Sequence, residues 1–371
     1  MPLTSFKPKT KPVDRILLVL TVVITLFGLL MVYDASIIEA NRLFADKYHF
    51  VRQQSLWAIF GFISLLVLSR LPLTWLAKLA LPGLIFSLIL LVAVLIPGFG
   101  QSTLGARRWL NLFGFTLQPT ELVKLTLSLY LAAWMAKKRH LLPFLALIAL
   151  ILGLIMLQPD LGTAIVVIFT AVLTYFISGA NLFHLFGLII LGLASGGGLI
   201  WLSDYRRARL LTFFDPGRDP LGSSYHIQQA LIAIGSGGWW GLGLGQSRQK
   251  YEFLPQVSTD SIFAIIAEEV GFIGAAILIA ALFYLVFRAI TIARFAPDEF
   301  SRLLASAIAG WLGIQTVINL SAMLALLPLT GVPLPFISYG GSSLVVNLAA
   351  VGILLNISRL CVNPKKKHDS A

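Results

Sequence analysis

The sequence predicts an all-α polytopic membrane protein with about ten transmembrane helices. Hydrophobic residues make up 58% of its 371 residues, charged residues only 12%, and the mean hydropathy is +0.88. A soluble domain is nearer half apolar and a quarter charged, and an outer-membrane barrel would show alternating rather than continuous apolar runs. The composition therefore excludes a soluble enzyme, a disordered chain, a fibre and a barrel of that kind.

The predicted spans are continuous apolar runs close to the roughly 20 residues that cross a bilayer core. The first run is too long for the apolar region of a signal peptide and lacks a small-residue cleavage pattern, so we assign it as a span. The spans lie at 16–33, 54–68, 73–96, 119–135, 141–157, 162–177, 182–202, 262–287, 303–326 and 342–357. The second and sixth are short, and the Pro and Gly residues between the fifth and sixth leave a re-entrant segment as an alternative.

Lysine and arginine residues predict the orientation of these helices, because cytoplasmic loops carry an excess of both. With the amino terminus inside, the inner segments hold most of the 28 Lys and Arg residues. We therefore expect a single integral membrane domain, 1–371, with both termini cytoplasmic as tails at 1–14 and 360–371. A long outer loop at 203–261 joins the seventh and eighth helices, and its apolar stretch 225–234 could lie as an interfacial helix.

Arginines gather in two outer segments, GARRWL and YRRARL, which contain Arg107, Arg108, Arg206 and Arg209. Guanidinium groups hold phosphate bidentately, so a pyrophosphate-bearing lipid would be a natural ligand if these residues met above the outer bilayer face. The alternative is a solvated loop. The net charge of +12 is explained largely by membrane topology, so we expect no nucleic-acid partner.

Charged residues also fall inside or beside predicted spans, where they point to function by default. Glu121 and Lys124 are three residues apart and would share one face of a helix, so they can neutralise each other. The alternative for this pair is a structural ion pair that fixes helix packing. Asp160 lies between two apolar runs and is a second candidate, although it could simply cap the following helix.

Asp260 falls at the first turn of a long predicted helix, at the outer membrane edge. A carboxylate there could accept a proton from a sugar hydroxyl, or it could act only as a helix cap. Two prolines and adjacent glycines in 331–343 break the chain near membrane depth. Because irregular backbone survives there only when it lines a polar cavity or is buried in protein, we include Ser338 and Gly340 among the candidate substrate-binding residues.

Other chemistries find little support in the sequence. The five histidines lack the spacing of zinc ligands, and we find neither a Walker loop nor a dinucleotide-binding fingerprint in the required context. The single cysteine, Cys361, cannot form an internal disulfide. No cofactor is implied; a divalent cation could assist phosphate chemistry, but no ligand cluster demands one.

Several motifs then occur together in an order typical of one family: GARRWL, QPTELVK, QPDLGT, YRRARL, DPLGSSYH, AIGSGGWWGLGLGQSRQKYEFLP, TDSIFAIIAEEVGFIG and TGVPLPFISYGGSS. The sequence resembles the SEDS family (shape, elongation, division and sporulation), to which RodA, FtsW and SpoVE belong. The match runs from about 17 to 359. The segments GLGLGQSRQKYEFLP and SSLVVNLAAVGILLNISR resemble the cell-division branch more than the elongation branch.

The resemblance implies a ten-helix peptidoglycan glycosyltransferase of the bacterial plasma membrane that polymerises lipid II, with Asp260 as its essential residue. The arginine motifs, the Glu121 and Lys124 pair and Asp160 would then surround the sugar and pyrophosphate. It also implies a class B penicillin-binding protein as transpeptidase partner, other division or elongation proteins, and a place at the division septum.

Lipid II carries its sugar α-linked and the glycan is β-1,4-linked, so the resemblance implies a single inverting displacement in which one base, Asp260, is enough. Arginines, with Lys124, would stabilise charge on the departing pyrophosphate. The family usually has Glu, His and Phe where this chain has Gln256, Ser258 and Ser261.

Three alternatives stay open on the sequence. A lipid II flippase would also use broken helices and membrane-depth charges, but it needs a pathway to both faces, whereas the candidate acids are predicted at the outer face. A non-catalytic scaffold for a transpeptidase would tolerate Asp260→Asn. The third alternative is an elongation polymerase, which the sequence alone does not separate from a division polymerase.

Overall fold

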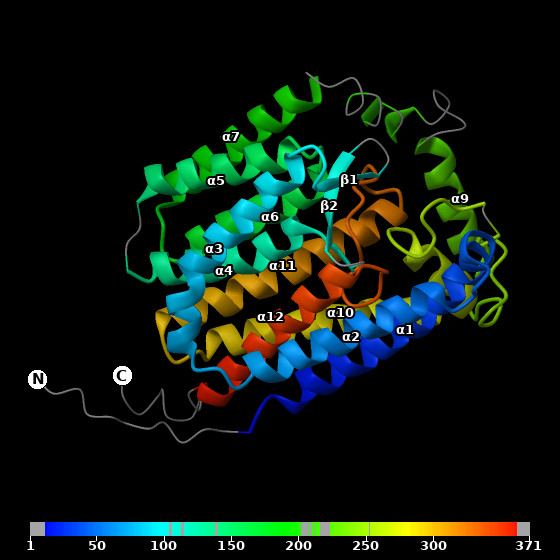
Figure 1. Ribbon diagram of the computed structural model, residues 1–371, viewed down its shortest axis with the longest axis horizontal. Coiled ribbons are helices and arrows are strands. Elements are labelled where there is room, and N and C mark those ends of the chain that lie inside the picture. The colour runs from blue at the N-terminus through cyan, green and yellow to red at the C-terminus, as the bar shows by residue number, and fades with distance from the viewer. Residues whose placement is uncertain are drawn as a thin grey trace, which may run out of the picture.

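A computed structural model describes residues 12–361, apart from 104–105, 113–114, 138–139, 202–206, 208–209, 212, 216–222 and 252. Long helices dominate the described part (Figure 1). In chain order the helices are α1 (Arg15–Phe44), α2 (His49–Leu68), α3 (Leu73–Leu95), α4 (Pro119–Met135), α5 (Leu141–Met156), α6 (Leu161–Ile177), α7 (Leu182–Trp201), α9 (Ser223–Ser236), α10 (Ile262–Arg294), α11 (Glu299–Met323) and α12 (Gly341–Leu360).

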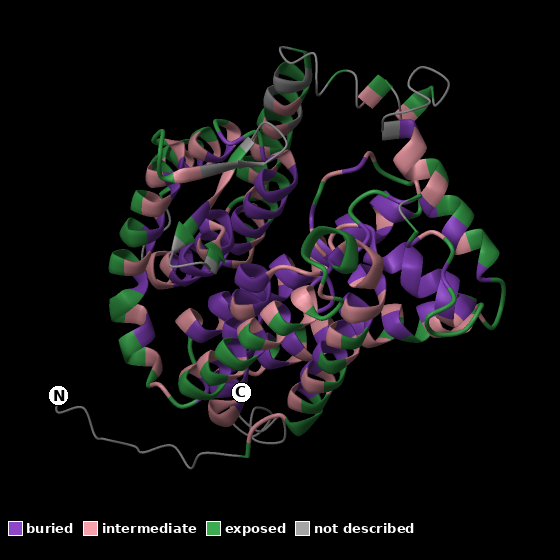
Figure 2. Ribbon diagram, turned by 45° about the vertical axis from the view of Figure 1, so that its right-hand side comes forward, coloured by how far each residue is buried: buried purple, intermediate pink, exposed green. Residues whose placement is uncertain are grey.

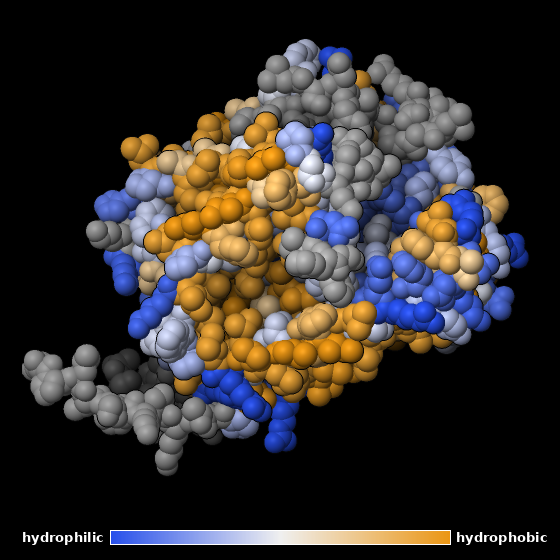
Figure 3. Space-filling model, in the orientation of Figure 1, coloured by the Kyte–Doolittle hydropathy of each residue, from blue (hydrophilic) through white to orange (hydrophobic). Residues whose placement is uncertain are grey.

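The helices form a bundle whose interior includes α4, α11 and α12, and 13 of the 17 residues of α4 are buried. α11 and α12 are also largely buried in protein, whereas α1, α2, α3 and α10 leave most of their surface exposed. Figure 2 shows the buried residues gathered inside the bundle, and Figure 3 shows a broad hydrophobic surface bordered by hydrophilic residues. Exposed leucines, isoleucines and phenylalanines on the outer helices are what a lipid-facing surface requires, since lipid chains replace water there.

Each predicted span coincides with a helix, and α4 begins and ends at the predicted residues. Six of the helices are long and apolar enough to cross a membrane by length and composition: α1, α2, α3, α10, α11 and α12. Shorter apolar helices, α5, α6 and part of α7, accompany them. A membrane protein of the predicted helical class is therefore confirmed, while the count of ten spans stays a prediction.

α1 is longer than predicted because polar residues at its C-terminal end do not stop a helix. The predicted span ends before Asp34, but the helix continues to Phe44 and closes at Ala45, whose left-handed backbone (φ 52°) lets its N–H reach Asn41 O. No Pro or Gly interrupts this extension. Asp34 is thus presented from a helix rather than from a loop.

A small antiparallel sheet between α3 and α4 was not predicted. Its strands are β1 (Gly100–Thr103), β2 (Ala106–Leu112) and β3 (Phe115–Leu117), in the order β1-β2-β3. β1 and β3 have only four and three residues, and the seven residues of β2, ARRWLNL, do not alternate between apolar and polar throughout. The sheet matters here because β2 carries Arg107 and Arg108.

α10 is broken at Gly271, and the segment before it fills the break. Gly271 adopts φ +69°, outside the helical region. The loop 237–261 supplies the missing partners: Leu242 N donates to Glu268 O (3.0 Å), and Phe272 N donates to Gly238 O (2.8 Å). Because unpaired backbone groups are costly near the membrane core, these hydrogen bonds fix the loop that leads to Asp260.

Candidate functional site

Asp260 lines a cavity of about 60 Å³ at one end of the bundle, which we call the Asp260 cavity. Its walls come from α9, the loop 237–261, the end of α11 and the loop 324–340. The lining residues are His226, Gln256, Asp260, Asn319, Ala322, Met323, Leu329, Thr330, Gly331 and Val332. Gly331 and Val332, from the irregular segment 331–343 noted in the sequence, thus line the same cavity as Asp260.

The backbone on both sides of this cavity is held by one buried amide. Asn319 Nδ2 donates to Asp260 O (3.0 Å) and to Val332 O (2.8 Å). Gly331 lies between these anchors with φ +74°, and a Cβ built there would be 3.4 Å from Asp260 Oδ2. A glycine therefore lets the chain turn and pass beside the carboxylate.

Asp260 does not occupy the N-cap position that its place in the sequence favoured. The cap residue of α10 is Ser261, and its side chain makes no capping hydrogen bond. Asp260 therefore precedes the helix and is half-buried at the cavity wall.

His226 is a cavity residue that the sequence reasoning missed, because no ligand spacing singles it out. Its Nε2 lies 2.6 Å from Ser261 Oγ, and Ser261 Oγ lies 3.0 Å from Pro255 O. Since a carbonyl only accepts, the Ser261 hydroxyl donates to Pro255 O. We therefore assign the proton to His226 Nε2, which donates to Ser261. A titratable ring from α9 thus shares the cavity with Asp260.

Asp160 acts as a helix cap, as one of its two readings predicted. Its Oδ1 accepts from Thr163 N (3.1 Å) and its Oδ2 accepts from Thr163 Oγ1 (2.8 Å). The helix that it caps, α6, touches the Asp260 cavity, because a Cβ built on Gly162 would lie 2.6 Å from Thr330 O. Asp160 is therefore a neighbour of the cavity and not one of its lining residues.

Of the four arginines predicted to bind substrate, Arg108 is the one that the structure places beside Asp160. Arg108 donates from Nε to Gln158 O (3.0 Å) and from a terminal nitrogen to Pro159 O, directly before Asp160. Arg107 precedes Arg108 in β2 and is exposed. Because successive strand residues face opposite sides of a sheet, its side chain points away from that of Arg108. The other two, Arg206 and Arg209, lie outside the described residues.

Glu121 and Lys124 form a buried ion pair, and neither lines the Asp260 cavity. Lys124 Nζ lies 2.8 Å from Glu121 Oε1 and donates to Gln315 Oε1 at 2.8 Å. Gln315 Nε2 in turn donates to Pro333 O (2.9 Å). The pair therefore supports the loop beside the cavity through Gln315, in agreement with the structural alternative stated for it.

Ser338 and Gly340 also hold backbone in place and do not line the cavity. Ser338 Oγ accepts from Leu334 N (2.8 Å), which closes a turn. Gln54 of α2 donates to Ser338 O (3.2 Å) and accepts from Gly340 N (3.1 Å). These contacts attach the loop before α12 to α2.

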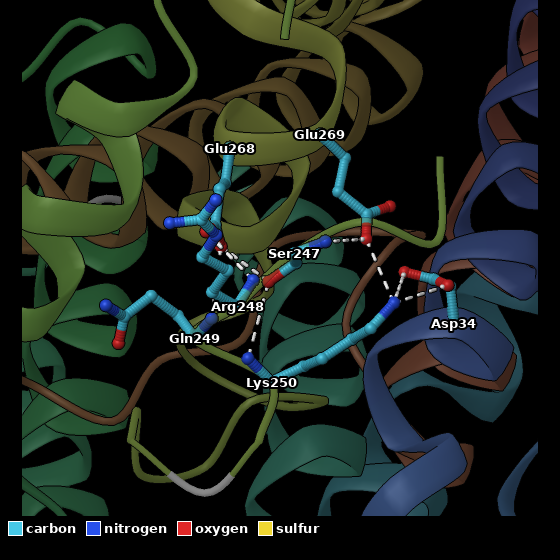
Figure 4. Close-up of polar contacts among 7 residues, drawn as sticks. All are labelled: Asp34, Ser247, Arg248, Gln249, Lys250, Glu268 and Glu269. Carbon is cyan, nitrogen blue, oxygen red and sulfur yellow. Dashed lines mark hydrogen bonds and ion pairs between the residues drawn. The ribbon is translucent and has the colours of Figure 1, made fainter. Parts of the chain in front are cut away.

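A buried ionic cluster, outside the predicted site, attaches the loop 237–261 to two helices (Figure 4). Lys250 Nζ lies 3.0 Å from Asp34 Oδ1 on α1 and 3.1 Å from Glu269 Oε1 on α10. Glu269 Oε1 also accepts from Ser247 N (3.0 Å). Burial acts to lower the pKa of the Lys250 ammonium, but the hydrogen bonds and charges of Asp34 and Glu269 outweigh burial and raise that pKa. We call these residues the Lys250 cluster.

Among the described residues, no group of three or more His, Cys, Asp or Glu side chains is arranged to hold a metal ion. The polar groups at the site are instead a carboxylate, an imidazole, amides and backbone carbonyls. These groups can orient hydroxyls and move a proton.

The chain matches the family model described as "Cell cycle protein", which spans FtsW, RodA and SpoVE, over residues 14–362. It is 39% identical over 365 residues to a probable peptidoglycan glycosyltransferase FtsW of Geobacter metallireducens, with 95% of this chain and 97% of that protein covered. It is 40% identical over 363 residues to stage V sporulation protein E of Bacillus subtilis, with 95% and 98% covered.

Solved structures agree over a similar length. A chain from the work described as "Structural coordination of polymerization and crosslinking by a peptidoglycan synthase complex" has a TM-score of 0.77 at 33% identity, with 94% of this chain and 98% of that chain covered. The rod shape determining protein RodA of Thermus thermophilus has a TM-score of 0.69 at 31% identity, with 95% and 98% covered. This chain is thus an integral membrane protein that belongs to the FtsW, RodA and SpoVE family of cell-cycle proteins.

Proposed function

We propose that the protein is a peptidoglycan glycosyltransferase that polymerises lipid II into β-1,4-linked glycan strands for septal wall synthesis. The observation that carries this proposal is the position of Asp260 on a polar cavity. Asn319 of α11 holds the backbone of Asp260 and that of the loop 324–340 beside it. Relatives similar over almost their whole length include a protein named for this activity. An arrangement built around one carboxylate suits a reaction that needs one base.

In the proposed reaction, the 4-hydroxyl oxygen of the acceptor sugar attacks the anomeric carbon of the donor. The new carbon–oxygen bond forms as the bond from that carbon to the pyrophosphate breaks, and the Asp260 carboxylate takes the hydroxyl proton. The bond electrons leave with the undecaprenyl pyrophosphate, so the α-linkage of the donor becomes a β-linkage in one inverting step. No covalent sugar–enzyme intermediate is needed.

The size of the cavity limits what enters it. At about 60 Å³ it is far smaller than the roughly 300–1,000 Å³ of pockets that enclose whole ligands. It accommodates a hydroxyl group and a few waters, so we propose that the sugar rings lie over its open side and that only the reacting hydroxyl reaches Asp260. His226 from α9 and Asn319 from α11 would border that hydroxyl.

The predicted substrate-binding residues take two roles in this proposal. Arg108, which donates to the backbone just before Asp160, would stabilise the leaving pyrophosphate, with Arg107, Arg206 and Arg209 as further cationic contacts. The network from Glu121 through Lys124 and Gln315 to Pro333 would position the loop 324–340 without touching the sugar. Ser338 and Gly340 would have the same positioning role through their contacts with Gln54.

We further propose that a class B penicillin-binding protein is the transpeptidase partner and that the pair works at the division septum. The support is the structural similarity to a chain of a peptidoglycan synthase complex and the likeness to FtsW. Other division proteins would recruit the pair, and lipid II would be its substrate.

Polymerisation by the purified protein tests the proposal. Wild type, Asp260→Ala and a matched control, Asp46→Asn, are supplied with lipid II, each with and without the partner transpeptidase. Asp46 is a half-exposed acid paired with the exposed Arg52, and a pair near the surface contributes about 0–1 kcal/mol. We expect glycan chains from wild type and Asp46→Asn and none from Asp260→Ala.

The other outcomes identify the competing functions. Wild-type protein that moves lipid II between leaflets but makes no glycan, even with its partner, would be a flippase. Wild-type protein with neither activity that still raises transpeptidase activity would be a scaffold. Polymerisation is supported over transport by the position of the acids. Asp260 and the start of α6, which Asp160 caps, both lie beside the loop 330–332 at one end of the bundle, whereas a transport pathway would need to reach both ends.

A further inference from the structure

A second cavity, of about 330 Å³, lies at the opposite end of the bundle. It is an open cavity lined by the first residues of α1 and the C-terminal ends of α10 and α12. Along α10 it is about 40 Å from the Asp260 cavity, at 1.5 Å rise per residue. Its distance from Asp260 separates it from the proposed reaction, and the distribution of Lys and Arg predicts that this end faces the cytoplasm.

The charged groups in this cavity leave positive charge uncompensated. Arg288 pairs through one terminal nitrogen with Asp14, whose Oδ1 also caps α1 by accepting from Leu17 N (3.0 Å). Arg15 also lines the cavity and makes no ion pair within the described part of the chain. Two guanidiniums therefore face one carboxylate, so the cavity carries a net positive charge.

Arg288 also presents an unused donor. Its Nε is buried and has no hydrogen-bond partner among the described residues. A buried N–H without a partner is costly, so an acceptor at this point would be stabilised.

The remaining wall is apolar and comes from Ile16, Ile292 and Phe295. A cavity with guanidiniums and an apolar side, placed at the predicted cytoplasmic edge of a membrane protein, suits a ligand that is both anionic and apolar. Basic pockets between helices on this side of the membrane bind acidic headgroups. Free phosphate shares the charge but has no use for the apolar wall.

We propose that this cavity binds the phosphate of an acidic phospholipid from the cytoplasmic leaflet. Arg288 and Arg15 hold the phosphate oxygens, and the glycerol and first methylenes of the lipid pack against Ile292 and Phe295. The bound lipid joins the cytoplasmic ends of α1, α10 and α12. This binding is independent of polymerisation at Asp260.

Cys361 reports occupancy of the cavity directly. It is the only cysteine of the chain, it lines the cavity, and it is partly exposed. The full-length protein is placed in nanodiscs of phosphatidylcholine alone or with one-third phosphatidylglycerol, and alkylation of Cys361 by uncharged N-ethylmaleimide is timed. We expect phosphatidylglycerol to slow alkylation about fivefold, the protection given by a ligand at about four times its Kd.

Two charge-neutralising variants separate this site from general effects of an anionic surface. Arg288→Gln removes the unused donor and should abolish the protection. Arg294→Gln removes the same charge from the last turn of α10, where the residue is exposed and does not line the cavity, and should keep the protection. Because Arg288→Gln also releases Asp14, Arg15→Gln is the second variant; it leaves that ion pair intact and should weaken the protection.

Three results would overturn the proposal. The first is equal alkylation of wild type in both membranes. The second is the same slowing in Arg288→Gln and Arg15→Gln as in wild type, which would assign the effect to surface charge. The third is full protection by inorganic phosphate in phosphatidylcholine discs, which would make the cavity a site for a free anion.

Discussion

Asn319 Nδ2 donates a hydrogen bond to the backbone oxygen of Asp260 at 3.0 Å and a second one to Val332 O at 2.8 Å. The candidate base is thus positioned from α11, a helix largely buried in protein, although Asp260 itself lies on a loop. One turn earlier on the same face, Gln315 donates to Pro333 O. Two amides four residues apart therefore hold both walls of the Asp260 cavity.

Replacing the first of these amides should slow polymerisation more than it unfolds the protein. Asn319→Leu leaves two carbonyl oxygens without their donor, at a cost of about 1–3 kcal/mol each, and a 1 Å shift of Asp260 can cost about 100-fold in rate. Thr316→Val is the control, because Thr316 Oγ1 donates only to Leu312 O within α11. Initial rates and melting temperatures of both variants check this; a folded Asn319→Leu protein with the wild-type rate would refute the positioning role.

His226 should matter through its contact with Ser261. His226→Ala removes a 2.6 Å hydrogen bond, worth about 1 kcal/mol, and opens the part of the cavity wall that α9 contributes. We expect the polymerisation rate to fall about tenfold with a changed pH profile. Ser261→Ala removes the acceptor but keeps the ring and should cost less. A pH–rate profile for each variant checks this, and identical profiles for wild type and His226→Ala would contradict it.

The buried pair of Glu121 and Lys124 should behave as a structural unit. Lys124→Met leaves Glu121 as an unpaired buried carboxylate, which costs about 3–5 kcal/mol, and the protein should lose much of its thermal stability. Adding Glu121→Gln removes that charge and should restore most of the stability and the polymerisation rate. If the double variant is stable but inactive, Lys124 contacts the substrate after all.

Asp160 should be needed as an oxygen acceptor and not as a charge. Asp160→Asn keeps an oxygen that can accept from Thr163 N, so we expect stability and polymerisation close to wild type. Asp160→Ala removes the cap and should cost about 1 kcal/mol, read as a lower melting temperature. A loss of activity in a stable Asp160→Asn protein would assign the carboxylate a direct role.

The Lys250 cluster should make stability depend on alkaline pH. The folded state raises the pKa of Lys250 above its ordinary 10.5, so the stabilisation is fully present below that value and is lost as pH rises through the higher folded pKa. As the pH rises above 10.5, the melting temperature of wild type should therefore fall more than that of Lys250→Met, which has no ammonium to titrate. Parallel melting curves would contradict this.

The helices follow from the sequence because their apolar runs are long and unbroken. The spans at 119–135 and 73–96 match α4 and α3 almost to the residue. The extension of α1 past Asp34 could not be predicted in this way, because hydropathy marks the apolar span and not the residue at which a helix ends outside it. The sheet could not be predicted, because β1 and β3 are too short for a periodic signal and the seven residues of β2 do not alternate strictly.

The site follows from the sequence only in part. Asp260 and the broken segment 331–343 are recognisable because their residue types are unusual beside a membrane span. His226 and Asn319 are not, because each reaches the cavity through tertiary packing from a distant helix. The roles of Lys124 and Asp160 depend on whether a partner lies within hydrogen-bond distance, and no spacing in the sequence decides that.

The measurement that tests the central claim most directly is the initial rate of lipid II polymerisation by Asp260→Asn, with the partner transpeptidase present. The amide keeps the size of the side chain but cannot take a proton. We predict a folded protein that still binds lipid II and polymerises it at least about 100-fold more slowly, the lower end of what a general base contributes. Polymerisation at the wild-type rate would contradict the account.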